Sequence, residues 1–110
     1  MIFTKEGNIT IVFQENIELK VFLDNLLKGY PKINKDNIVV NLFSFDALNA
    51  NDVLEFLQIS NTHRASKKSF VLVTNKVSYD DVPEELCVTP TIQEAKDIIE
   101  MEEIERDLDL

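Results

Sequence analysis

Apolar residues in this chain form short dense runs that are separated by longer stretches with helical spacing. Residues 1–14 predict a β-hairpin, because Gly7 and Asn8 are typical turn residues and the second arm, residues 9–13, is β-branched and aromatic. Residues 38–43, 70–74 and 86–88 predict further strands. The run at 38–43 is nearly continuously apolar, which is typical of a strand that is covered on both faces of a parallel sheet.

A first helix is expected over residues 17–30. Asn16 is its predicted N-cap, and Gly29 and Pro31 are predicted to end it. Its apolar residues recur at steps of three and four and define one buried face: Leu19, Phe22, Leu23, Leu26 and Leu27.

Two more helices are expected, over residues 50–65 and from residue 91 onward. The second helix has an apolar side made of Val53, Leu54, Phe56, Leu57 and Ile59. At the start of the third, Thr91 and Glu94 have the spacing of a capping box, in which the hydroxyl and the carboxylate each accept a backbone amide. Its apolar stripe is Ile92, Ala95, Ile98 and Ile99. Residues 75–85 are polar and predict a loop or an irregular turn.

Strands that alternate with helices imply βαβ units with right-handed crossovers. The expected fold is therefore α/β, with a mixed, mostly parallel sheet of about four to five strands and three main helices. The length suits one domain over residues 1–110, with an acidic helical end over about residues 100–110 that we expect to be solvated.

The chain is acidic, with 20 Asp and Glu residues against 11 Lys and Arg and a net charge of −9. Such a surface repels nucleic acid, so no nucleic-acid partner is expected. No apolar run approaches the ~20 residues that span a bilayer, and the first residues lack the pattern of a signal peptide. One cysteine allows no intramolecular disulfide. We expect a soluble cytoplasmic protein without a membrane partner.

Catalytic and cofactor motifs are scarce. Gly7 and Gly29 are the only glycines, and neither stands between a strand and a helix as a phosphate-binding loop requires. Zinc sites usually draw on several His and Cys ligands, whereas this chain has His63 and Cys87 alone. A Cys87–His63 nucleophile pair is disfavoured because Cys87 falls in an apolar strand. We expect no catalytic residue, metal or cofactor.

Two segments are candidates for contact with a partner. The turn at residues 49–52 follows a buried strand, and the carboxyl ends of parallel strands are where ligands meet such sheets. Its simpler interpretation is an N-cap, with Asn49 or Asn51 capping and Asp52 complementing the helix dipole. Residues 61–68 gather Arg64, Lys67 and Lys68. Dipole complementation at a helix end is the simpler interpretation there, and a docking patch for an acidic partner or half of a self-association surface is the alternative.

The order of elements resembles the STAS domain of anti-anti-sigma factors over nearly the whole chain. In that family the turn after the strand at 38–43 carries an Asp-Ser-Ser/Thr-Gly motif, and a kinase that is also the anti-sigma factor phosphorylates its hydroxyl. Here residues 49–52 read Asn-Ala-Asn-Asp, and the nearest hydroxyls are Ser44 and Ser60. The resemblance therefore implies the scaffold without the phosphorylation switch.

Segments 60–64, 67–71, 82–86 and 90–108 are also similar to a family of short bacterial proteins that often carry the automatic name ribonuclease Z. Ribonuclease Z itself is a metallo-β-lactamase-fold phosphodiesterase with a His-rich two-zinc centre. One histidine cannot form that centre. This resemblance implies an accessory or regulatory role beside such an enzyme in the processing of tRNA 3′ ends.

The expected function is regulation by binding another protein, without catalysis. The STAS resemblance implies a partner of the anti-sigma kinase or regulator type, and a homodimer stays open. The expected contact surface consists of Asn49, Asn51, Asp52, His63 and Arg64. Two alternatives stay open. The first is a small nuclease that acts on tRNA ends, or an accessory protein or subunit associated with ribonuclease Z. The second is a sensor of a nucleotide or lipid.

Overall fold

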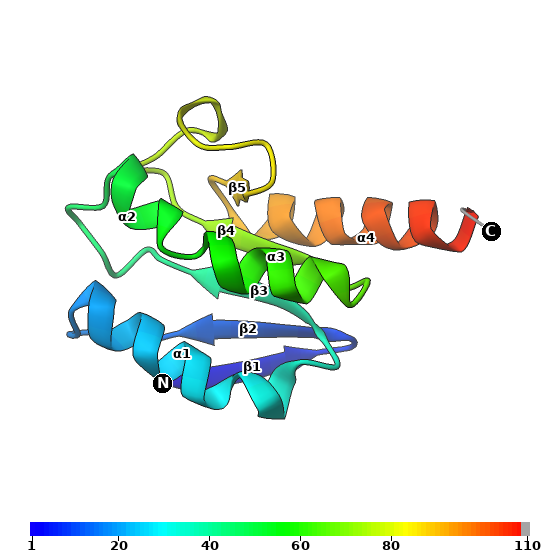
Figure 1. Ribbon diagram of the computed structural model, residues 1–110, viewed down its shortest axis with the longest axis horizontal. Coiled ribbons are helices and arrows are strands. Elements are labelled where there is room, and N and C mark those ends of the chain that lie inside the picture. The colour runs from blue at the N-terminus through cyan, green and yellow to red at the C-terminus, as the bar shows by residue number, and fades with distance from the viewer. Residues whose placement is uncertain (109–110) are drawn as a thin grey trace.

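The computed structural model describes residues 1–108 and contains a mixed five-stranded sheet in the order β1-β2-β3-β4-β5. β1 runs antiparallel to β2, and all the other neighbouring strands are parallel (Figure 1). The predicted fold class is confirmed. The strands are β1 (Ile2–Glu6), β2 (Ile9–Phe13), β3 (Asn37–Asn41), β4 (Phe70–Val73) and β5 (Cys87–Thr89).

Helices cover the two faces of this sheet unequally. The helices between the parallel strands, α1 (Leu19–Ile33), α2 (Ala50–Leu54) and α3 (Leu57–Ala65), pack on one face, and α4 (Ile92–Leu108) alone packs on the other. The β4–β5 connection holds only a short 3₁₀ turn, η1 (Tyr79–Asp81). Consecutive crossovers of the same handedness place their helices on the same face of the sheet. The opposite face is therefore covered by α4.

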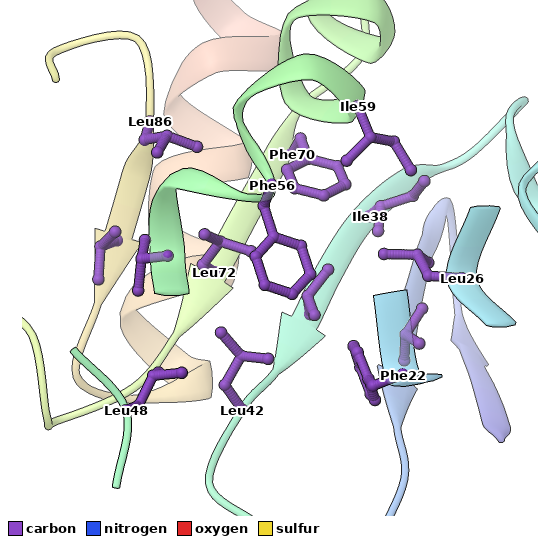
Figure 2. Packing of buried hydrophobic residues seen from close by; sticks show 14 of the residues in the cluster. Phe22, Leu26, Ile38, Leu42, Leu48, Phe56, Ile59, Phe70, Leu72 and Leu86 are labelled. Carbon is purple, nitrogen blue, oxygen red and sulfur yellow. The ribbon is translucent and has the colours of Figure 1, made fainter. Parts of the chain in front are cut away.

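The larger core lies between α1, α2, α3 and the sheet. Phe56 reaches into its centre beside Phe22 (Figure 2). The Phe22 ring meets the rings of Phe56 and Phe45 edge-on, at centroid distances of 6.3 and 5.4 Å. The smaller core lies between α4 and the other face of the sheet. It consists of the strand residues that point to this face and of two residues of α4: Ile11, Val39, Val71, Val73, Ala95 and Ile99. The central strands are thus apolar on both faces, as the run at 38–43 predicts.

The predicted end of the first helix is wrong, since α1 continues through Gly29 and Pro31 to Ile33. Proline has a backbone φ close to the helical value, and in the last turn it removes only one hydrogen bond. Gly29 serves another purpose: a Cβ atom there would lie 2.8 Å from Cζ of Phe3. The predicted N-cap is also wrong, because Asn16 has a left-handed φ of 53° and the cap position is Glu18.

The predicted helix over 50–65 is divided in two. The amides of Glu55 and Phe56 donate to carbonyls three residues back, at 3.2 and 3.1 Å, which tightens the chain into a 3₁₀-like turn between α2 and α3. This turn changes the direction of the helix so that Phe56 is fully buried, whereas Leu54, expected on the buried side, is exposed.

Only one of the two backbone hydrogen bonds predicted for the capping box at Thr91 is present. The Glu94 amide donates to the Thr91 hydroxyl oxygen at 3.1 Å, but the Glu94 carboxylate accepts from that hydroxyl, at 3.0 Å, instead of from a backbone amide. α4 then continues to Leu108; Asp109 and Leu110, the last residues of the expected acidic end, lie outside the described residues. Within residues 1–108, no helix combines the length and hydrophobicity that crossing a bilayer requires.

Phe56→Ala should lower the free energy of unfolding by about 3–5 kcal/mol, because it removes a fully buried ring and leaves a cavity between α2, α3 and the sheet. Phe43→Ala, the same change at an exposed phenylalanine, should cost about 1 kcal/mol or less. Urea unfolding of both variants measures the difference, and equal losses would contradict the described packing.

Candidate functional site

The carboxyl ends of β3, β4 and β5 meet at one edge of the sheet, which we call the carboxyl edge. A groove of about 820 Å³ opens there between the segment after β4, the end of β5 and the first turns of α4. Val88 and Ile98 supply apolar lining, and Tyr79, whose side chain is 70% exposed, lies beside them. Acidic lining comes from Asp81, Glu94 and Asp97. The groove thus combines apolar contact area with a negative rim.

The loop that forms one wall of this groove is held at both ends. Val77 and Leu86 are buried in the larger core. The Thr74 amide donates to the Thr89 carbonyl at 2.9 Å, and the Lys76 amide donates to the Thr74 hydroxyl at 3.1 Å. Between these anchors the η1 turn, which contains Tyr79, stays at the surface. The groove is therefore preformed by loop packing.

The turn at residues 49–52 lies on the same carboxyl edge, at the start of α2. The Asp52 amide donates to Asn49 Oδ1 at 3.0 Å, and the Asn49 amide donates to Asp52 Oδ2 at 3.1 Å, which completes a capping box. Both side chains therefore stabilise the turn itself. Asn51 is exposed, and its side chain takes no part in the two hydrogen bonds of the capping box.

His63 lies at the other edge of the sheet, where the parallel strands begin, which we call the amino edge. Its side chain is fully buried. Nε2 lies 2.8 Å from the Asp36 carbonyl oxygen and Nδ1 lies 2.7 Å from the Tyr30 hydroxyl. Because a carbonyl only accepts, the neutral ring carries its proton on Nε2 and accepts from Tyr30 on Nδ1. His63 thereby ties α1 and α3 to the start of β3.

The surroundings of His63 favour this neutral ring. Burial lowers the pKa of His63, and the nearby charges of Lys68 and Arg64 lower it further, while the hydrogen bond to Asp36 opposes them. Burial also raises the pKa of Tyr30, which keeps its hydroxyl protonated as a donor. His63 is a structural residue of the core and presents no surface to a partner.

Arg64 belongs to a polar cluster at the amino edge that links α3, β4 and α4. Its guanidinium donates to Glu102 Oε2 and to the Phe70 carbonyl, each at 3.1 Å. Glu102 accepts from the Ser69 hydroxyl at 2.6 Å, and Arg106 donates to the same hydroxyl oxygen at 3.1 Å. The Ser69 amide in turn donates to Asn37 Oδ1 at 2.8 Å. We call Asn37, Arg64, Ser69, Glu102 and Arg106 the amino-edge cluster.

The residues that the sequence groups into one expected contact surface lie at opposite ends of the strands. Asn49, Asn51 and Asp52 lie after β3 on the carboxyl edge, whereas His63 and Arg64 bind groups at the starts of β3 and β4. The sequence reasoning missed the Tyr79 groove and the amino-edge cluster. A signal for the cluster was present, since polar residues directly precede two buried strands at Asn37 and Ser69.

Cys87 and His63 do not form a nucleophile pair, because Tyr30 and Asp36 occupy both ring nitrogens of His63. Burial, above all, raises the pKa of the Cys87 thiol, Arg64 lowers it and Glu102 raises it, so the thiol stays protonated. Across the described residues, no three or more His, Cys, Asp or Glu side chains are grouped so that they would hold a metal ion.

Of the two hydroxyls nearest the turn at 49–52, that of Ser44 is hydrogen-bonded elsewhere in the fold and that of Ser60 is buried. Ser44 donates to the Gln14 carbonyl at 2.7 Å. Ser60 is fully buried in α3.

Comparison with known proteins adds no relative to this picture: no protein-family model matches the chain, and no curated protein is significantly similar to it.

The free energy of unfolding should fall as the pH drops below the ordinary His pKa of 6.5. Below pH 6.5 the imidazole of the unfolded chain binds a proton, whereas that of the folded chain, whose pKa is lowered, stays neutral. The stabilisation is therefore fully present above pH 6.5, and the free energy of unfolding decreases below pH 6.5 by up to about 1.4 kcal/mol per pH unit. His63→Gln should be less stable but have a flatter pH dependence. Urea unfolding of the wild type and of His63→Gln from about pH 7.5 to 5.5 measures how the free energy of unfolding of each depends on pH. Because His63 is the only histidine, the same dependence in both proteins would contradict a neutral, buried His63.

Proposed function

We propose that this chain is a non-catalytic, protein-binding regulatory domain of the STAS type that acts in the cytoplasm and contacts its partner through the carboxyl edge. The observation that carries the proposal is the exposed Tyr79 beside the apolar lining of Val88 and Ile98, in a groove of about 820 Å³. Tyrosine is enriched in protein interfaces because its ring buries a large area while its hydroxyl finds a hydrogen bond.

The rigidity of this edge supports the proposal. The Asn49–Asp52 capping box fixes the turn before α2, and the buried Val77 and Leu86 fix both ends of the β4–β5 loop. A partner that binds here orders few additional side chains, so more of its contact energy is retained as affinity. A typical interface of about 600–800 Å² per partner is within reach of a domain of this size.

The charge of the carboxyl edge indicates what kind of partner fits. Asp81, Glu94 and Asp97 line the groove, and among residues 1–108 Lys76 is the one cation that lines it. A surface with basic side chains around an apolar centre complements this rim. The proposal contains no phosphorylation switch at residues 49–52, because that turn has no hydroxyl.

A sensor of a small ligand is the second candidate, and the volume of the groove is the observation that favours it. About 820 Å³ falls in the range of about 300–1,000 Å³ that is usual for ligand pockets, and such pockets commonly lie at the carboxyl ends of parallel strands. A ligand with a cationic or hydrogen-bond-donating group would suit the acidic lining.

Asn51→Arg should abolish capture of the partner by the immobilised protein from an extract of its own cells, because it places bulk and positive charge on the carboxyl edge. Tyr79→Ala should weaken capture as well. Asn34→Arg, the same change at an exposed position on the amino edge, is the matched control and should capture normally. All three should keep the wild-type Tm to within a few degrees, which corresponds to about 0.5 kcal/mol. Capture that is equal in all the variants would overturn the proposed surface.

A thermal-shift series with nucleosides, which donate hydrogen bonds without a phosphate charge, and with short-chain phosphatidylcholine, whose headgroup is cationic at its end, separates the second candidate from the first. A saturable rise in Tm that Tyr79→Ala removes would favour the sensor, since a ligand that binds only the folded state stabilises it. Under the protein-binding proposal, we expect no such rise.

A further inference from the structure

The second half of α4 carries an apolar stripe that is mostly exposed. Met101, Ile104 and Leu108 are 61%, 53% and 76% exposed. Their spacing of three and four residues places them on one side of the helix. Ala95 and Ile99 face the sheet, as do Glu102 and Arg106 through their contacts with Ser69. The stripe therefore points away from the body of the molecule, along the part of α4 that extends past the strands in Figure 1.

This stripe has the spacing of a coiled-coil seam. With Met101 and Leu108 at a positions and Ile104 at d, the flanking e and g positions are Glu100, Glu105 and Asp107. All three flanking residues are acidic and exposed. Residues at e and g contact the partner helix and decide which partner is accepted.

The basic residues of α4 do not offset these acids. Lys96 binds Glu6 at 2.9 Å, and Arg106 donates to Ser69 at 3.1 Å. Both therefore lie toward the body and away from the stripe. Among the described residues, none of Glu100, Glu105 and Asp107 forms an ion pair.

A second copy of this chain is a poor occupant of the stripe. Parallel pairing brings g residues against e residues, and antiparallel pairing brings g against g and e against e. In either orientation carboxylates meet carboxylates, so two copies repel each other. A helix with basic e and g residues instead gains an ion pair at each of these positions.

We propose that the stripe of α4 binds an amphipathic helix of another protein that carries aliphatic residues at a and d and Lys or Arg at e and g. This inference rests on the proposed function as a protein-binding domain, but it assigns a second surface, separate from the groove of the carboxyl edge. The seam is short, about 10 Å from Met101 to Leu108 at a rise of about 1.5 Å per residue. Binding is therefore modest and weakens with salt.

The probe is a synthetic three-heptad peptide with Leu and Ile at a and d and Lys at e and g, compared with the same peptide carrying Glu at e and g. Fluorescence anisotropy with the full chain should show saturable binding of the Lys peptide, at least about tenfold tighter than that of the Glu peptide. Raising the salt from about 50 to 500 mM should reduce the difference. Equal binding of the two peptides, or binding of neither, would overturn the inference.

Variants of the full chain test the surface itself. Ile104→Gln keeps a good helix former but removes the central apolar contact, and should weaken the Lys peptide about tenfold. Val21→Gln, at an exposed apolar residue of α1, is the matched control and should change nothing. The triple change Glu100→Lys, Glu105→Lys and Asp107→Lys should reverse the preference toward the Glu peptide.

Two further measurements separate this inference from its rivals and from the proposed function. If sedimentation shows a dimer and Ile104→Gln dissociates it, a second copy of the chain occupies the stripe and the proposal is wrong. Asn51→Arg should bind the Lys peptide normally, because it alters the carboxyl edge only. If the peptides fail while Asn51-dependent capture persists, this inference is wrong and the proposed function stands.

Discussion

One helix has to keep water from a whole face of the sheet, and the rest of the structure depends on this constraint. β3 and β4 alternate their side chains between the faces, with Ile38 and Leu72 toward α1–α3, and Val39 and Val71 toward α4. Both faces are apolar, so both must be covered. The crossovers place all their helices on one side. The hydration of Val39 and Val71 is therefore decided by where α4 lies.

Polar contacts, rather than apolar ones, fix that position along the second half of α4. Beyond Ile99 the helix buries no further hydrophobic residue, and Glu102 and Arg106 instead reach Ser69 at the start of β4. An apolar stripe tolerates small rotations of a helix, whereas directional hydrogen bonds between charged and buried groups do not. The amino-edge cluster thus sets the rotation of α4, and with it the side of the helix that Met101 and Ile104 expose.

The elements of the fold were predictable from the sequence, because dense apolar runs and helical periodicity report burial directly. The junctions between these elements were not predictable from the sequence. The break before α3 comes from two hydrogen bonds to carbonyls three residues back, and the apolar spacing around Phe56 does not encode them. Pro31 was interpreted as a helix end although proline in a last turn removes a single donor.

The candidate site was less predictable than the fold, for a related physical reason. Asn49 and Asp52 were correctly placed at a helix start, where local hydrogen bonds decide the geometry. His63 and Arg64 were assigned to the contact surface because they lie on the predicted helix that begins at the 49–52 turn. Their partners are the carbonyls of Asp36 and Phe70, which only the tertiary fold brings near. The Tyr79 groove depends on the path of an aperiodic loop, for which the sequence carries no repeating signal.

The contact between Phe3 and Gly29 has a consequence for how this sequence can vary. The ring of Phe3, on the edge strand β1, comes so near α1 that a Cβ atom at position 29 would lie 2.8 Å from it. A larger residue at 29 would push the ring into water and leave an aromatic side chain on an unpaired strand edge, which favours aggregation. Evolutionary change at these two positions should therefore be correlated: homologues that carry a side chain at 29 are expected to carry a smaller residue at 3.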